Sequence, residues 1–104
     1  MAKSKHKTKA EKEHLNKVAE IGCIACLSNG YEDTPAELHH IRTNSGAGQR
    51  ASHYQVIPLC PYHHRQGSNA IHQSKVNFEN DFGTEEYLLM VVNVMLGVEV
   101  SANE

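Results

Sequence analysis

An ordered set of cysteines and histidines constrains this chain more than any other feature. It contains two pairs with metal-ligand spacing, Cys23-x-x-Cys26 and Cys60-x-x-His63. Two such pairs are the usual grip on a tetrahedral zinc ion. A chain of 104 residues builds only a thin core, and zinc compensates because its binding energy is folding energy. We therefore expect one structural zinc here. Buried free cysteines are the alternative, and His64 could replace His63 as the fourth ligand.

Four further histidines exceed what that zinc needs: His39, His40, His64 and His72. Neighbouring residues on a strand point to opposite faces, so His39 and His40 cannot both bind one metal. His64 and His72 could close a three-histidine site with His39. The surplus suggests a second, open metal site with a base beside it, as in a metal-dependent hydrolase. From spacing alone, adventitious metal binding or a plain polar surface is the alternative.

The order of the secondary-structure signals predicts an α+β fold. Residues 1–9 are too polar to be buried and are expected to form a disordered basic tail, ahead of a single domain over 10–104. We expect a helix over 10–21, a strand over 38–41, a loop over 42–53, a second strand over 55–59, a short helix over 61–66 and a final helix over 84–96. The middle is therefore a ββα unit. The last helix has almost no polar face, and packing over the domain is favoured over a dimer interface.

The net charge of -2 hides an uneven distribution of charge. Basic residues gather in the N-terminal tail and in residues 38–76, which hold no acid. Such zones favour a polyanion such as DNA, although a solubilising surface is the plainer explanation. The candidate DNA contacts are Arg42, Arg50, Arg65, Lys3, Lys5, Lys7 and Lys9. Three cysteines without a signal peptide fit a reducing cytoplasm, and no apolar run is long enough to span a membrane.

Taken together, the pattern resembles the HNH nucleases, also called ββα-metal or His-Me finger nucleases. Four segments carry the resemblance: 23–26 (CIAC), 38–42 (LHHIR), 57–64 (IPLCPYHH) and 69–72 (NAIH). The similarity covers residues 14–96 and is greatest to the phage recombination-enhancement nucleases of the Ref type. Residues 49–54 (QRASHY) also resemble that branch.

The resemblance implies roles for individual residues. His39 would ligate a catalytic metal, with His64 and His72 completing its ligand set, and His40 would be the general base. The implied cofactors are the structural Zn²⁺ and a catalytic divalent ion, which could be Mg²⁺, Mn²⁺ or Zn²⁺. This sequence departs from the branch at His63, where a second cysteine is usual. Gln55 falls near the position of the middle asparagine of the HNH name.

The sequence thus predicts a zinc-stapled ββα-metal (HNH) core between N- and C-terminal helices. Its expected activity is endonucleolytic hydrolysis of DNA phosphodiester bonds by a monomer, and the resemblance adds a recombinase filament that directs cutting. A non-catalytic zinc-stabilised DNA-binding or adaptor module is an alternative, since it needs neither His40 nor His72. A toxin-like nuclease with a bound inhibitor is another.

Overall fold

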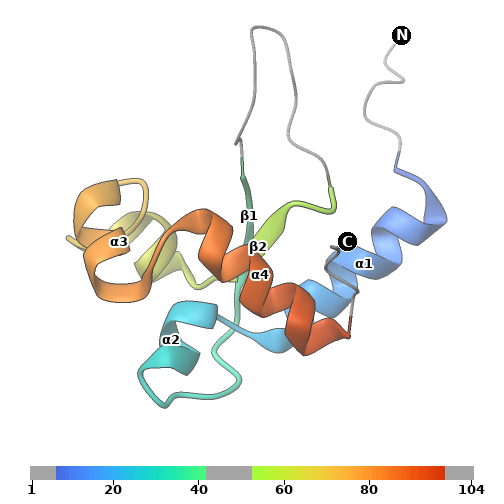
Figure 1. The fold of residues 1–104 in the computed structure, drawn as a ribbon, viewed down its shortest axis with the longest axis horizontal. Coiled ribbons are helices and arrows are strands. Elements are labelled where there is room, and N and C mark those ends of the chain that lie inside the picture. The colour runs from blue at the N-terminus through green and yellow to red at the C-terminus, as the bar shows by residue number, and fades with distance from the viewer. Residues whose placement is uncertain (1–6, 42–52, 98–104) are drawn as a thin grey trace, which may run out of the picture.

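The computed structural model describes residues 7–41 and 53–97, which form an α+β fold. Two short strands lie at the centre, and the helices surround them (Figure 1). The elements in chain order are α1 (Lys9–Ile21), α2 (Ile24–Ser28), β1 (Glu37–His40), β2 (Val56–Leu59), the π-helical turn η2 (Tyr62–Gln66), α3 (Lys75–Phe82) and α4 (Glu85–Leu96). The expected ββα unit is thus present as β1, β2 and η2, between helices α1 and α4. Within the described residues, every helix is too short or too polar to cross a membrane.

Strand β2 forms the centre of the core. It pairs antiparallel with β1, so that His39 lies opposite Ile57 and His40 opposite Val56. All four β2 residues are buried, although side chains alternate between the two faces of a strand. Both faces of β2 are therefore covered, and helices α1, α2 and α4 all contact it.

The N-terminal boundary of α1 differs from the expected one. The Thr8 hydroxyl accepts a hydrogen bond from the Glu11 N–H at 3.0 Å, and the Glu11 carboxylate accepts one from the Thr8 N–H at 2.9 Å. This capping box starts the helix at Lys9. Thr8 and Lys9, which were expected to belong to a disordered tail, therefore form the capped start of α1. Residues 1–6 of that tail lie outside the described residues.

Helix α3 has no counterpart among the predicted elements. Its local signals are the Ser74 cap, whose side chain accepts from the Asn77 N–H, and Gly83 at its end. Only Phe78 and Phe82 are buried, so the helix has a narrow apolar stripe that periodicity alone does not reveal.

Helix α4 matches its predicted cap, with the Thr84 side chain accepting from the Tyr87 N–H. Leu88 and Val92 are buried in the core. The helix therefore packs over the domain along one face only. Leu89, Val91 and Leu96 are partly buried against the core, whereas four other large apolar residues are exposed: Tyr87, Met90, Val94 and Met95.

Candidate functional site

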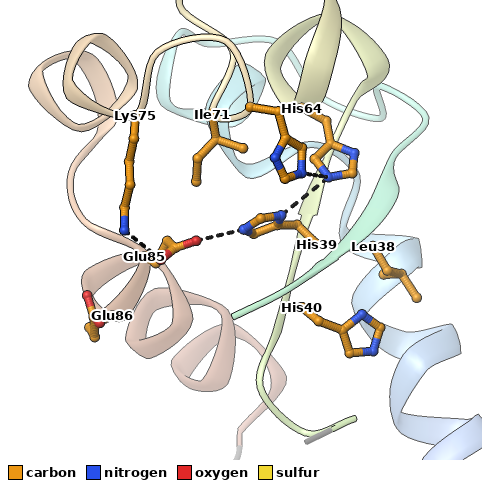
Figure 2. Close-up of a pocket in the computed structure, with 9 residues that line it drawn as sticks. Leu38, His39, His40, His64, Ile71, Lys75, Glu85 and Glu86 are labelled. Carbon is orange, nitrogen blue, oxygen red and sulfur yellow. Dashed lines mark hydrogen bonds and ion pairs between the residues drawn. The ribbon is translucent and has the colours of Figure 1, made fainter. Parts of the chain in front are cut away.

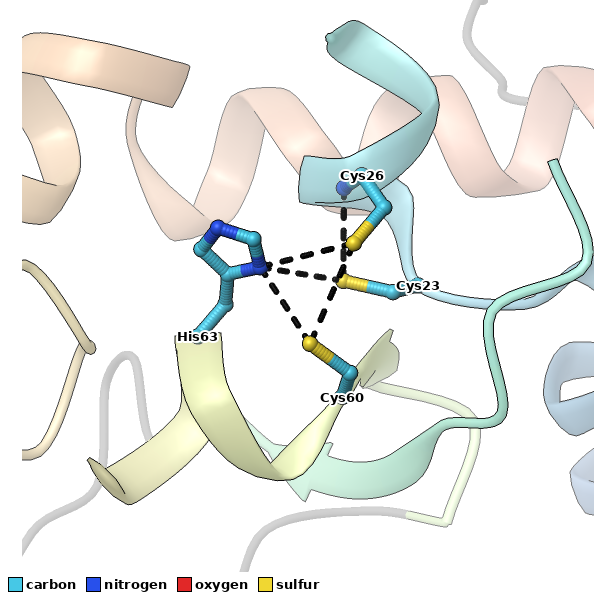
Figure 3. A group of neighbouring side chains, drawn as sticks. All are labelled: Cys23, Cys26, Cys60 and His63. Atoms are coloured by element: carbon cyan, nitrogen blue, oxygen red, sulfur yellow. Dashed lines mark hydrogen bonds between the residues drawn. The ribbon is translucent and has the colours of Figure 1, made fainter. Parts of the chain in front are cut away.

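Three cysteine sulfurs and one imidazole nitrogen converge in the interior (Figure 3). His63 Nδ1 lies 3.7, 3.6 and 3.3 Å from the Sγ atoms of Cys23, Cys26 and Cys60, and the last two sulfurs are 3.9 Å apart. Zinc bonds of about 2.3 Å to sulfur and about 2.05 Å to nitrogen imply tetrahedral edges of about 3.6 Å (S to N) and about 3.8 Å (S to S). The observed distances agree, so these four side chains could hold a metal ion.

Local backbone geometry brings the first cysteine pair into place. Gly22 has a φ of 82°, and a Cβ there would lie 3.1 Å from the carbonyl oxygen of Thr34. Glycine therefore allows the close approach in which the Cys23 N–H donates to that same oxygen at 2.9 Å. Cys23 Sγ then accepts from the Cys26 N–H at 3.4 Å and caps α2, which places both sulfurs on one side of the turn.

The second pair lies where β2 passes into η2. The His64 N–H donates to the Cys60 carbonyl at 2.8 Å and so begins the helical turn that carries His63. The His63 ring packs edge-on against Phe82 of α3, with centroids 5.1 Å apart. Helix α3, which was not predicted, thus supports the fourth side chain of the cluster.

Burial sets the electrostatics of this cluster. It raises the pKa of the Cys23 thiol to about 12, so a thiolate there requires a cation among the sulfurs. Burial also lowers the pKa of His63, which keeps its imidazole neutral with a lone pair available for a metal. These four side chains therefore favour a bound divalent metal over a cluster of unliganded thiols.

A second cluster contains the three histidines that spacing had grouped, His39, His64 and His72. His64 Nε2 lies 3.3 Å from His39 Nδ1 and 3.1 Å from His72 Nε2. Nitrogen ligands around tetrahedral zinc are about 3.3 Å apart, and adjacent ligands of an octahedral ion are about 3.0 Å apart. The observed separations fit either geometry.

This cluster lies in an open pocket of about 590 Å³ (Figure 2). Strand β1, η2, the turn after it and the first residues of α3 and α4 all contribute to its wall. The lining residues are Leu38, His39, His40, His64, Ile71, His72, Lys75, Glu85 and Glu86. The Cys3His cluster is buried, whereas the three-histidine cluster faces a cavity that a substrate could enter.

Two histidines of the cluster, His39 and His64, each contact a carboxylate through the ring nitrogen that faces away from the cluster. The spacing of residues in the sequence did not predict either contact. His39 Nε2 is 2.7 Å from Glu85 Oε2, and Lys75 Nζ is 3.4 Å from the other oxygen of Glu85. This chain of contacts is visible in Figure 2. The His39 hydrogen bond is the main cause that lowers the pKa of Glu85, so this carboxylate is ionised at neutral pH.

Glu37 plays the corresponding part for His64. Its Oε1 lies 2.8 Å from His64 Nδ1. Arg65 donates two hydrogen bonds to the same carboxylate, at 3.0 Å from Nε and 2.7 Å from Nη2. The Arg65 guanidinium, followed by His64, lowers the pKa of Glu37 to about 2. Arg65 therefore binds a carboxylate beside the cluster, although its side chain stays 52% exposed.

His40 points away from its neighbour His39, as the alternation of a strand predicts (Figure 2). It lines the pocket, and its Nε2 lies 3.1 Å from His53 Nδ1. Burial is the main cause that lowers the pKa of His40, and the nearby charges of His53, His39 and Lys7 act in the same direction. His40 is therefore a neutral imidazole near pH 7.

The residues predicted to contact DNA are only partly described. Lys3, Lys5, Arg42 and Arg50 lie outside the described residues. Lys7 precedes the capped start of α1, and Lys9 is the first residue of that helix. Sequence reasoning overlooked Lys75, which is the one Lys or Arg among the described residues that line the pocket.

A comparison with family models identifies one that matches residues 7–96, described as recombination enhancement, RecA-dependent nuclease. The matched segment includes both histidine and cysteine clusters. Among curated proteins, none matches the chain. Because the family model covers most of the sequence, the chain belongs to the family of recombination-enhancement, RecA-dependent nucleases.

Proposed function

We propose that this protein is a metal-dependent endonuclease of the HNH (ββα-metal) type, which hydrolyses phosphodiester bonds in DNA. The observation that carries the proposal is the convergence of three histidine nitrogens in an open pocket that His40 also lines. Structural zinc sites are closed by four protein ligands, whereas catalytic sites keep a position open for water or substrate. The buried cluster offers four protein ligands, whereas the three-histidine cluster offers three and faces the pocket.

In this proposal the buried cluster holds a structural Zn²⁺ on Cys23, Cys26, Cys60 and His63. It joins α2 to the end of β2 and the start of η2, which are far apart in sequence. The neighbouring β1 and η2 supply two of the three histidines of the pocket. A zinc ion that fixes η2 therefore also fixes His64, the residue next to ligand His63.

The open cluster holds the catalytic metal on His39, His64 and His72. A divalent ion bound there, Mg²⁺, Mn²⁺ or Zn²⁺, would offset the charge that develops on the scissile phosphate and the leaving 3′ oxygen. His40 accepts the proton of the attacking water, which its lowered pKa permits at neutral pH. His53, 3.1 Å from His40, helps to hold the base in place.

The proposed DNA contacts are the basic residues of the tail and of the middle segment. They are Lys3, Lys5, Lys7, Lys9, Arg42, Arg50 and Arg65, to which the structure adds Lys75 as a candidate. Residues 10–104 act as a single nuclease domain, and a RecA filament directs its cutting. The RecA dependence in the description of the family supports this partner.

Cleavage assays test the proposal. Purified protein that retains its structural zinc is incubated with single-stranded, duplex and RecA-coated DNA, with and without each divalent metal. We expect cleavage that depends on added metal and leaves 5′-phosphate and 3′-hydroxyl ends, because water attacks phosphorus and the 3′ oxygen leaves. DNA binding without cleavage under every condition would favour a non-catalytic module instead.

A further inference from the structure

We propose that Glu85 and Glu37 are positioning residues that fix the tautomers of His39 and His64. In this arrangement His39 binds metal through Nδ1, and His64 binds it through Nε2. The inference rests on the proposed function and deepens it, because it names which nitrogen each histidine uses and what selects that nitrogen.

His39 lies beside an ionised carboxylate, that of Glu85. A neutral imidazole carries one N–H and one lone pair, whereas an ionised carboxylate can only accept hydrogen bonds. Because Glu85 Oε2 lies 2.7 Å from His39 Nε2, the proton belongs on Nε2. The lone pair of His39 is then on Nδ1, which faces the cluster.

His64 differs from His39 because its other ring nitrogen, Nδ1, contacts the carboxylate. Glu37 Oε1 lies 2.8 Å from His64 Nδ1, so that nitrogen carries the proton and Nε2 carries the lone pair. The lone pairs of His39 Nδ1 and His64 Nε2 are therefore directed at each other across 3.3 Å. Two acceptors at that distance repel unless a cation lies between them, so the outer carboxylates shape an inner site for a metal.

Each carboxylate also has a cation on its far side. Lys75 Nζ is 3.4 Å from Glu85, and the Arg65 guanidinium is 2.7 Å from Glu37. These cations favour the ionised carboxylates, which must accept from the histidines for the tautomers to be fixed. The Glu85 side chain is 12% exposed and that of Glu37 is 34% exposed. Loss of the more sheltered Glu85 should therefore have the larger effect.

Titration with Co²⁺ alone tests the inference without any cleavage assay. Protein that retains its structural zinc is titrated, and binding is followed by visible absorption for wild type, Glu85→Ala and Glu37→Ala. Outer partners of metal-binding histidines typically contribute ~10–100-fold in affinity, so we expect a loss in that range for Glu85→Ala and a smaller loss for Glu37→Ala. Glu20→Ala is the matched control, because it also removes a carboxylate, but from an exposed position of α1 that does not line the pocket. It should bind Co²⁺ as wild type does.

Nitrogen-15 NMR of the histidine rings gives an independent readout before Co²⁺ is added. We expect the Nε2–H tautomer for His39 and the Nδ1–H tautomer for His64, and each should change when its own carboxylate is removed. Unchanged tautomers and unchanged Co²⁺ affinity in both variants would overturn the inference while leaving the proposed nuclease function standing. Wild-type protein that binds no Co²⁺ would instead contradict the proposed metal site, and NMR would still test the tautomers. If Glu85→Ala loses its zinc or no longer unfolds cooperatively, the Co²⁺ affinity and the ring tautomers of Glu37→Ala, at the start of β1, test the inference instead.

Discussion

The Cys26→Ser substitution should destabilise the whole domain, because it removes one of four ligands from the buried cluster. Cys26 Sγ lies 3.6 Å from His63 Nδ1 and 3.9 Å from Cys60 Sγ, at the distances of a tetrahedral site. Structural zinc contributes about 10–16 kcal/mol of apparent binding free energy, so one ligand in four corresponds to about 2.5–4 kcal/mol. That is a large part of the 5–15 kcal/mol by which a typical domain is stable.

For a domain of this size, such a loss lowers the melting temperature by about 10–30 °C. Thermal unfolding followed by circular dichroism, together with zinc quantification by mass spectrometry, measures both effects. Ala25→Ser is the matched control, because it adds the same hydroxyl at the neighbouring buried position in α2 without removing a ligand. It should keep the tightly held zinc, whatever the hydroxyl costs in stability. The reasoning is refuted if wild type contains no zinc and Cys26→Ser melts at the wild-type temperature.

Four further predictions concern catalysis and DNA binding. His40→Ala should cleave ~10²–10⁴-fold more slowly and keep its zinc, melting temperature and DNA affinity; equal rates would remove His40 as the base. Because burial lowers the pKa of His40, the neutral base persists as pH falls through 6.5, and the wild-type pH–rate profile should decline only below that value. A decline that begins well above pH 6.5 contradicts this assignment. His72→Ala should need far more added metal for cleavage at an unchanged melting temperature, whereas superimposable metal titrations exclude it as a ligand. Deletion of residues 1–6 removes Lys3 and Lys5 but not the cap of α1, so the slope of log affinity against log salt should fall by ~0.9 for each lysine that contacts duplex DNA. An unchanged slope would show that neither lysine contacts a phosphate.

Local spacing predicted which cysteines and histidines form pairs, and the four-ligand chemistry of zinc predicted that the two pairs meet, although Cys23 and His63 are 40 residues apart. Cys23 and Cys26 share one turn, and alternation along a strand separates His39 from His40, so each relation depends on a few neighbouring residues. The strand, loop and helix signals likewise placed β1, β2 and α4 within a residue or two of their observed bounds. That these clusters hold metals stays a prediction.

The outer carboxylates could not be predicted, because their contacts depend on the tertiary fold. Glu85 meets His39 across a separation of 46 residues, and Glu37 meets His64 across 27. In the sequence, Glu85 is an ordinary acid in the first turn of a helix, where acids are common anyway. Arg65 was a candidate for phosphate binding on charge alone, and only the fold shows that its guanidinium pairs with Glu37.

Anomalous diffraction from crystals soaked in Mn²⁺ tests whether the two clusters bind metal ions as proposed. The proposed pair of metal sites predicts a zinc peak among Cys23, Cys26, Cys60 and His63, and a manganese peak in the pocket bound by His39 Nδ1, His64 Nε2 and His72. Manganese bound through His40, or no manganese peak in the pocket when cleavage requires added metal, would contradict it.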